Sequence, residues 1–241
     1  MKAGIITQAR MSSTRLPGKV MKEIGGRPMI WYHIRRAMMS GVQVYVATST
    51  NPADECLTRF CLEMGVPCFQ GSETNVLERY YQCATTHELD VIVRITSDCP
   101  LIDGELVRNA LDIYIEKNDP SLYLSNYLER TFPRGFDFEI FSYPALEDAY
   151  LNASEPAYLE HVTPYINRNI SGKISFFHIT RQEDDSRYRI TVDTPDDFRL
   201  LKEMIEKFQC DSMNAEEIIK ILRDNPYLYD INSHVEQKSV D

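Results

Sequence analysis

Residues 5–22, IITQARMSSTRLPGKVMK, run from an apolar segment directly into a positively charged loop. The loop carries four cations: Arg10, Arg15, Lys19 and Lys22. No acidic residue precedes Glu23, although the 241-residue chain has a formal net charge of −10. Small residues would let backbone N–H groups approach phosphate oxygens: Ala9, Ser12, Ser13, Thr14 and Gly18. The order of strand, small residues and cations predicts a polyanion-binding loop after a first strand, and the alternative is a solvated basic turn.

The first half of the chain alternates between strand and helix patterns. Strands are expected at 3–8, 42–49, 66–69 and 91–96, the last a nearly continuous apolar run typical of a buried parallel strand. Helices are expected at 28–41, 53–64, 74–87 and 103–117. This alternation predicts an α/β fold with a mostly parallel central sheet and helices on both faces.

The second half is less regular. We expect strands at 120–126, 136–141, 173–179 and 187–193, and helices at 142–153, 156–169, 195–207 and 214–223. The length suits a single domain over residues 1–228, followed by a loose tail over 229–241 with little apolar content. The irregular section 120–180 is a candidate arm for sugar binding or for a homodimer contact.

Composition excludes several classes of protein. Hydrophobic residues make up 43% and charged residues 26% of the chain, as in globular proteins. No apolar run approaches the roughly 20 residues of a membrane span, and the N-terminus reads as a strand, so we expect a cytoplasmic protein without a membrane partner. The acidic balance argues against nucleic acid. The six cysteines lack metal-site spacing, and we expect reduced core thiols.

Two aspartates stand out because each directly follows an expected strand. Asp98 follows 91–96 and Asp193 ends 187–193, and each is followed two positions later by a proline, Pro100 or Pro195. Strand ends face the ligand crevice in open α/β sheets. Two carboxylates there, opposite a phosphate loop, would suit Mg²⁺ bridging to a nucleoside triphosphate. The alternative is that each aspartate caps the following helix.

Other motifs narrow the chemistry. GxxxxGK[ST] and GxGxxG are both absent, so neither a P-loop enzyme nor a dinucleotide-binding enzyme is indicated. His33 lies on a helical stripe and is expected to pack in the core. Cys99 lacks a partnered base in the sequence and is not expected to be a nucleophile. His161, within SEPAYLEHVTPYI, could be either a substrate contact or a helix-surface residue.

The segment TQARMSSTRLPGKVMKEIGGRPMI (7–30) resembles the signature of sugar cytidylyltransferases, the group that contains CMP-Kdo and CMP-sialic acid synthetases. The similarity is strongest to the spore coat polysaccharide biosynthesis branch. Further blocks of that branch follow in order: GSETNVLERYYQCA (71–84), VRITSDCPLID (93–103), PRGFDFEIF (133–141), EHVTPYI (160–166) and RITVDTPDDF (189–198). The resemblance covers about residues 3–200.

The resemblance implies a Rossmann-like nucleotidyltransferase fold, a GT-A-like three-layer sandwich, that couples CTP to an acidic sugar and uses Mg²⁺. It implies a nucleotide site formed by Gln8, Ala9, Arg10, Ser13, Arg15, Lys19, Arg79 and Thr96. Asp98 and Asp193 would ligate the metal, and Arg15, Lys19 and Asp98 would be catalytic. The sugar candidates in the second half are Arg134, Asp137, Glu139 and His161, and Arg134 has the planar fork that matches a carboxylate.

Two positions depart from the pattern of the relatives. Val20 stands where the sialic acid enzymes have Asn, and Thr96 stands where relatives have a Gln that helps to read cytosine. Two alternatives to a cytidylyltransferase remain at this point. One is a metal-dependent glycosyltransferase that consumes a nucleotide sugar, although the strand 91–96 leads into SDCP rather than an Asp-x-Asp pair. The other is a non-catalytic nucleotide-binding relative.

Overall fold

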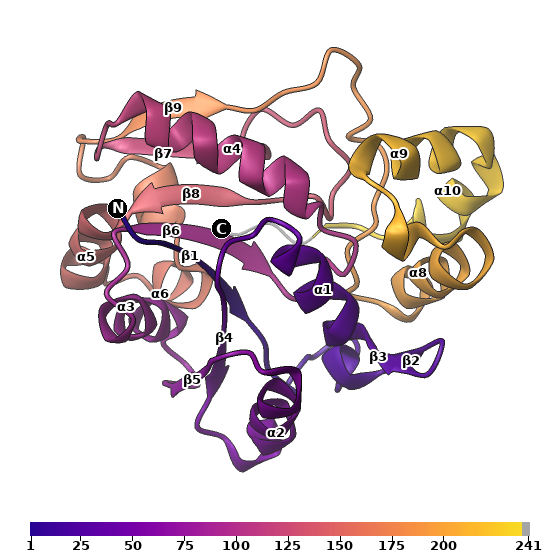
Figure 1. Ribbon diagram of the computed structural model, residues 1–241, viewed down its shortest axis with the longest axis horizontal. Coiled ribbons are helices and arrows are strands. Elements are labelled where there is room, and N and C mark those ends of the chain that lie inside the picture. The colour runs from indigo at the N-terminus through magenta and orange to yellow at the C-terminus, as the bar shows by residue number, and fades with distance from the viewer. Residues whose placement is uncertain (238–241) are drawn as a thin grey trace.

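The computed structural model describes residues 1–237, which fold around a seven-stranded sheet (Figure 1). In spatial order the strands are β5 (Cys68–Gly71), β4 (Val44–Ser49), β1 (Ala3–Gln8), β6 (Val91–Thr96), β8 (Glu139–Ser142), β7 (Leu122–Ser125) and β9 (Ser175–His178). Only the two pairings of β8, with β6 and β7, are antiparallel in this sheet. A small hairpin, β2 (Glu23–Ile24) and β3 (Arg27–Pro28), follows the first loop. The predicted mostly parallel sheet is confirmed.

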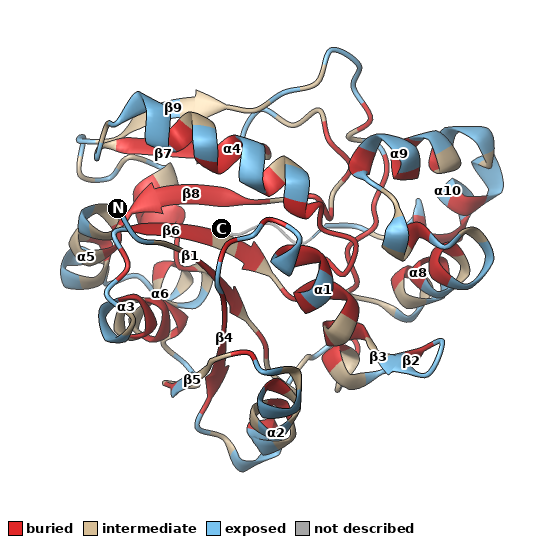
Figure 2. Ribbon diagram, in the orientation of Figure 1, coloured by how far each residue is buried: buried red, intermediate tan, exposed pale blue. Residues whose placement is uncertain are grey.

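Helices cover both faces of the sheet, because successive strand residues point to opposite sides. Ile5 belongs to the core beneath α1 (Met29–Met38), α2 (Glu55–Met64) and α4 (Gly104–Lys117). Ile6 belongs to the core beneath α3 (Val76–Thr86), α5 (Tyr143–Asn152), α6 (Pro156–His161) and α7 (Pro164–Asn167). Figure 2 shows buried residues along the strands and on the helix sides that face them. The three-layer α/β sandwich is therefore confirmed.

Three helices form a group at the right of Figure 1: α8 (Pro195–Phe208), α9 (Ala215–Asp224) and α10 (Pro226–Asn232). The sequence predicts a loose tail from residue 229, and this is wrong for its first part. Pro226 starts α10, which packs on α8 and buries Leu228 and Ile231. The domain boundary expected at residue 228 therefore falls inside a helix. Residues 238–241 lie outside the described residues.

Two further segments differ from the sequence prediction. The strand expected over 187–193 does not form: Arg187 lies in a turn and Asp193 in a bend, and the segment between them makes a single parallel bridge, Arg189 to Arg134. The segment crosses closely over Gly135 (φ +120°), where a Cβ would come within 2.7 Å of Ile190 Cγ1. The position beside β6 belongs instead to β8. The helix expected over 156–169 is divided, because Val162 has φ 72° between α6 and α7.

The parallel arrangement fixes where the loops meet. β1 lies between β4 and β6, and all three run in the same direction. The loops that follow these strands therefore emerge at one edge of the sheet, the carboxyl edge. The cation-rich loop after β1 and the SDCP turn after β6 are neighbours for this reason.

Candidate functional site

Lys19 lies between the two aspartates singled out from the sequence. Its Nζ is 3.3 Å from Asp98 Oδ2 and 2.9 Å from Asp193 Oδ1, and it donates to Val192 O at 2.7 Å. The Lys19 side chain is 13% exposed and that of Asp193 16%. Gly18, with φ +66°, immediately precedes the short 3₁₀ turn Lys19–Met21 that begins with Lys19. Three segments far apart in the sequence thus meet at the carboxyl edge.

The helix-capping alternative for these aspartates is wrong. The first turn of α4 is capped by Asp103, whose carboxylate accepts from the backbone N–H of Glu105 and Leu106. The first turn of α8 is capped by Thr194 in a capping box with Asp197. Asp98 and Asp193 therefore cap neither helix, and their carboxylates form ion pairs with cations instead.

The electrostatics at this point are strongly coupled. Burial alone would raise the pKa of Asp98, but the charge of Lys19 and hydrogen bonds from Thr96 and Lys19 bring it below its ordinary value. Burial alone would lower the pKa of Lys19, and the charges of Asp98 and Asp193 raise it above its ordinary value. The aspartate is thus held anionic and the lysine cationic, as a site for phosphate and a divalent cation requires.

Two arginines contact the other carboxylate oxygen of Asp193. Asp193 Oδ2 is 2.9 Å from Arg15 Nη2 and 2.7 Å from Arg189 Nη2. Arg189 also binds Asp197 through Nε at 2.9 Å. Sequence reasoning missed Arg189 and Asp197. The only available signal was the spacing of these residues and Asp193 at intervals of four. That spacing predicts contact only within a helix, and Arg189 and Asp193 precede α8.

The cation-rich loop is anchored at several points. Met11 N donates to Asp54 Oδ1 at 2.7 Å, and Gly18 N donates to Met11 O at 3.0 Å. Leu16 and Val20 are buried. Charge repulsion in the loop is offset by acids from elsewhere in the chain, with Arg10 lying 3.6 Å from Glu160. Asp54 and Glu160 are distant from the loop in sequence, so the residues of the loop alone do not reveal these contacts.

The proposed nucleotide residues occupy the ends of β1 and β6 and their surroundings. Gln8 and Thr96 are direct neighbours across the two strands. Gln8 Oε1 is buried without a hydrogen-bond partner in the described residues, which is uncommon for a buried polar atom. Ala9 is buried, and the Ser13 N–H donates to Met11 O within the loop. The expected nucleotide positions therefore lie at or beside the cation-rich loop, but Ala9 is buried and the Ser13 N–H is already hydrogen-bonded within the loop.

Arg79 has a largely structural environment. It is 1% exposed, and its Nη1 donates to Ser72 O at 2.9 Å. Its side chain packs directly over Gly71, where a Cβ would approach Arg79 Cγ to 3.1 Å. Burial lowers its pKa, and the nearby charge of Arg10 lowers it further. Arg79 thus holds the segment after β5 close to the loop, while its Nε lacks a partner in the described residues.

Two sugar candidates lie in the turn before β8. Asp137 Oδ1 is 2.5 Å from Arg130 Nη1. Burial lowers the pKa of Arg134, and the charge of Arg130 adds to this effect. The backbone of Arg134 pairs with the extended segment that leads to Asp193, through Tyr188 O and Ile190 N. These residues are therefore tied to the same segment as Asp193.

Glu139 does not have the environment of a sugar ligand. It lies directly across from Arg94 in the β6–β8 pairing and forms an ion pair with it. Tyr123 OH donates to the other carboxylate oxygen, and Tyr127 OH lies at 3.4 Å. With its side chain 4% exposed and both oxygens engaged, Glu139 is a buried structural acid. Its Arg94 partner is non-local, which is why the sequence did not reveal the pair.

His161 lies at a strained turn. Thr163 N donates to His161 O at 2.8 Å across Val162, whose φ 72° and ψ −57° define a γ-turn that is rare for a β-branched residue. Strained conformations of this kind gather at binding sites. Burial lowers the pKa of His161, while the charge of Glu160 partly opposes that effect. His161 is therefore biased toward its neutral form.

His33 and Cys99 support the site from within. His33 is fully buried and bridges Thr7 Oγ1 and the Cys99 carbonyl, both at 2.9 Å. Its predicted core packing is confirmed. Burial and the charge of Asp98 raise the pKa of the Cys99 thiol well above its ordinary value. A thiol in that environment stays protonated, which agrees with the prediction that it is not a nucleophile.

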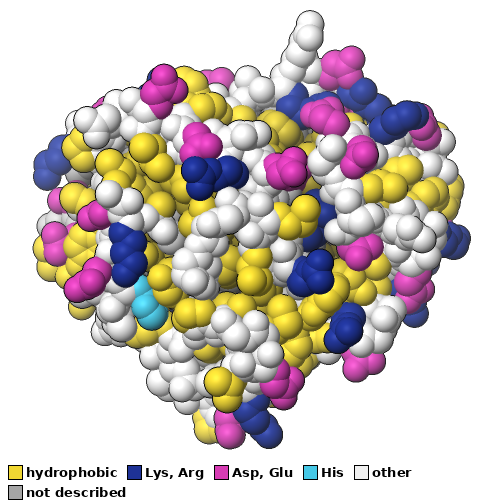
Figure 3. Space-filling view, viewed as in Figure 1, with side chains coloured by type: hydrophobic (Ala, Val, Ile, Leu, Met, Phe, Trp, Pro, Cys, Tyr) yellow, Lys and Arg dark blue, Asp and Glu magenta, His cyan; other side chains and the backbone are white. Residues whose placement is uncertain are grey.

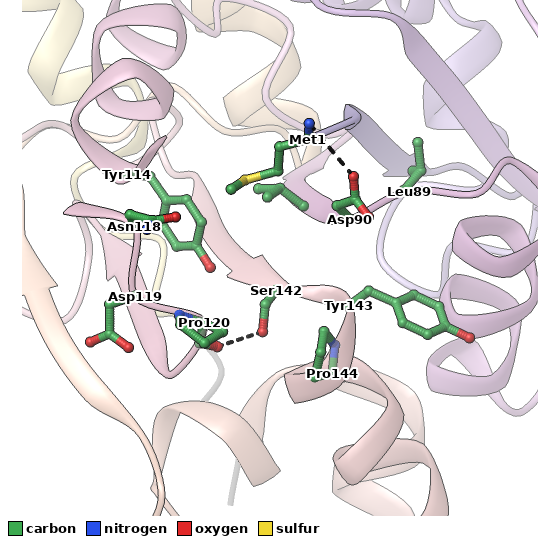
Figure 4. A pocket seen from close by; sticks show the side chains of 11 residues that line it. Met1, Leu89, Asp90, Tyr114, Asn118, Asp119, Pro120, Ser142, Tyr143 and Pro144 are labelled. Carbon is green, nitrogen blue, oxygen red and sulfur yellow. Dashed lines mark hydrogen bonds and ion pairs between the residues drawn. The ribbon is translucent and has the colours of Figure 1, made fainter. Parts of the chain in front are cut away.

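A separate cavity of about 630 Å³ lies at the opposite, amino edge of the sheet. Its lining residues are Met1, Leu89, Asp90, Val91, Tyr114, Asn118, Asp119, Pro120, Ser142, Tyr143 and Pro144. Figure 4 shows its mostly apolar and aromatic walls, with Asp90 near the terminal amine of Met1. Val91 begins β6 and Thr96 ends it, so the length of that strand separates this cavity from the aspartates.

Three observations bear on possible partners. Within residues 1–237, no group of three or more His, Cys, Asp or Glu side chains is close enough to hold a metal ion. Two carboxylates are available at Lys19, and Mg²⁺ sites commonly combine one or two carboxylates with substrate phosphates. In the face seen in Figure 3, basic and acidic side chains are interspersed. No helix among the described residues is long and apolar enough to cross a membrane.

Comparison with known proteins supports the same assignment. The sequence profile of the cytidylyltransferases matches residues 4–237. The spore coat polysaccharide biosynthesis protein SpsF of Bacillus subtilis is 31% identical, over 92% of this chain and 94% of its own. A cytidylyltransferase structure from Leptospira borgpetersenii superposes with a TM-score of 0.91 at 34% identity, covering 99% of both chains. A CMP:2-keto-3-deoxy-manno-octonic acid synthetase complexed with CTP shares the fold, with a TM-score of 0.62 at 20% identity, over 86% of this chain and 100% of its own. By its sequence over nearly the full length, this chain belongs to the cytidylyltransferase family.

Proposed function

We propose that this protein transfers a cytidylyl group from CTP to a hydroxyl of an acidic sugar and releases pyrophosphate. The observation that carries the proposal is Lys19 held between Asp98 and Asp193 at the carboxyl edge, in a member of the cytidylyltransferase family. A family relative serves spore coat polysaccharide biosynthesis by its name, so the product would feed a surface glycan.

Asp98 and Asp193 would hold the Mg²⁺. The fit rests on the chemistry of the donors: two anionic oxygen ligands face a position that a cation, Lys19 Nζ, already occupies. When bound, the metal would neutralise phosphate charge and polarise the α-phosphate. Water and phosphate oxygens would complete its coordination, as is usual for Mg²⁺.

Lys19 and Arg15 would then serve the leaving group. Both pair with Asp193, and a triphosphate would give them new anionic partners. Their charges would oppose the negative charge that builds on pyrophosphate during in-line attack by the sugar hydroxyl. Catalysis would come mainly from positioning and charge neutralisation.

The substrates would lie on either side of this centre. Gln8 and Thr96, which are neighbours at the ends of β1 and β6, would lie beside the cytosine ring. Arg134, Asp137 and His161 remain the sugar candidates, because Glu139 is engaged in the core. A guanidinium at Arg134 would suit a sugar carboxylate.

The test is an assay with each of the four nucleoside triphosphates, Mg²⁺ and a panel of sugar acids, with released pyrophosphate and the nucleotide sugar both measured. Cytidylyl transfer predicts pyrophosphate and a CMP-sugar from CTP. Consumption of a nucleotide sugar without pyrophosphate would favour a glycosyltransferase. Nucleotide binding without any product on the full panel would favour a binding module.

A further inference from the structure

The last helix, α10, ends with a side chain that reaches toward the site. Asn232 is 2% exposed. Its Nδ2 donates to Asp197 Oδ1 at 2.8 Å and to the carbonyl of Arg189 at 3.0 Å. One buried amide therefore ties the C-terminal helix to the first turn of α8 and to the extended segment before it.

Asp197 is the centre of this connection. Its Oδ2 accepts from the backbone N–H of Asp193 at 3.0 Å and of Thr194 at 2.9 Å, and its Oδ1 accepts from Arg189 Nε and Asn232. A carboxylate that is 1% exposed requires such a full set of donors. The hydrogen bond to Asp193 N fixes the backbone of the residue proposed to bind the metal.

Arg189 carries the connection onward to the Asp193 carboxylate. Its guanidinium is planar, so binding Asp197 through Nε fixes the direction of Nη2. That nitrogen is 2.7 Å from Asp193 Oδ2. The other oxygen, Oδ1, is left facing Lys19 Nζ at 2.9 Å.

We propose that Asn232 is a positioning residue for the metal site, acting through Asp197 and Arg189 on Asp193. The inference rests on the proposed function, because it requires Asp193 to be a metal ligand. The helix taken from the sequence as part of a loose tail is then the outer support of the site. Removing a residue that orients a metal ligand through hydrogen bonds typically changes metal affinity by about 10- to 100-fold.

The experiment measures by calorimetry how much Mn²⁺ tightens CTP binding without a sugar, relative to CTP in EDTA. Asn232→Leu, of similar size but without donors, should reduce that tightening by about tenfold. Asn232→Ser is the second variant in case the first folds poorly. Leu228→Ala is the matched control, because it loosens the packing of α10 without touching the polar chain, and it should preserve the tightening.

A double variant separates positioning from general destabilisation. If Asn232 acts through Asp193, Asn232→Leu should add nothing to the loss in Asp193→Asn. The inference fails if Asn232→Leu and Asn232→Ser behave as wild type, if Leu228→Ala causes the same loss, or if the effects of Asn232→Leu and Asp193→Asn multiply. If Asp193→Asn itself retains full Mn²⁺ tightening, the proposed metal site fails together with the inference.

Discussion

The two ends of the sheet present chemically different surfaces to a ligand. At the carboxyl end, Lys19, Asp98 and Asp193 from three distant segments meet in mostly buried ion pairs. At the amino end lies a cavity of about 630 Å³ with mainly apolar and aromatic walls. Phosphate and metal chemistry requires the first environment. The charged cluster, and not the apolar cavity, therefore marks the end of the sheet that has this chemistry.

The largest effect is expected from the two aspartates. Asp98→Asn and Asp193→Asn should each lower the rate of nucleotidyl transfer by about a hundredfold or more, because a metal site supplies several kcal/mol of transition-state stabilisation. Steady-state pyrophosphate release measures this, with circular dichroism to verify folding. Asp196→Asn removes the same charge from an exposed neighbour and should stay close to wild type. Near-normal turnover in either aspartate variant would remove that residue from the mechanism.

A pH effect is expected from His33 beneath the carboxyl end. Burial lowers its pKa, so the unfolded chain takes up this proton near pH 6.5 while the folded protein remains neutral at that site. The stabilisation is complete above about pH 6.5 and is lost as pH falls toward the folded pKa. The free energy of unfolding should decrease by up to about 1.4 kcal/mol per pH unit in that window.

Urea unfolding at pH 7.5, 6.5 and 5.5 checks this sign. His33→Gln should be less stable at pH 7.5 but should show a flatter dependence on pH than wild type. An unchanged slope in His33→Gln would show that other groups control the acid response.

Base selection should change by a smaller amount. Thr96 is shorter than the Gln of relatives and offers one hydroxyl in place of an amide. We expect a preference for CTP over UTP with a margin reduced by about 0.5–1.5 kcal/mol, or up to roughly tenfold. Thr96→Gln should widen that margin in competitive calorimetry, with Thr96→Ser as the control. A preference of the wild type for a purine triphosphate would overturn the cytidylyl assignment.

The smallest effect is expected at the amino end. Val91→Ile extends a side chain that lines the cavity and should raise the free energy of unfolding by at most about 0.8 kcal/mol, the value for one buried methylene. Transfer rates should stay within about twofold of wild type. A large loss of activity with retained stability would show that the two ends are coupled and that the contrast between them is too simple.

Local patterns account for what the sequence predicted well. The run at 91–96 became β6, and the strand–helix alternation up to α4 gave the parallel half of the sheet. The aspartates were found because each follows an extended segment, even though 187–193 turned out to lie outside the named strands. Periodicity and strand-end placement are properties of short stretches, so a single sequence reveals them.

Non-local pairings account for what was missed. Glu139 was predicted to contact the sugar because its cross-strand partner, Arg94, is distant in the sequence. Asn232 meets Asp197 and Arg189 only after α10 packs on α8, and the polar residues Asp230 and Asn232 gave the end of α10 the composition of a tail. Val162 has a positive φ although it is not a glycine, so the sequence did not indicate the γ-turn.

The central claim is that Asp98 and Asp193 hold the metal at the position now taken by Lys19 Nζ. Crystals grown with Mn²⁺ and CTP, measured by anomalous diffraction, test it directly. The claim predicts an Mn²⁺ peak at about 2.0–2.3 Å from an oxygen of each aspartate, with Lys19 moved onto the β- or γ-phosphate. An Mn²⁺ ion away from both carboxylates, or Lys19 still between them with nucleotide bound, would contradict it.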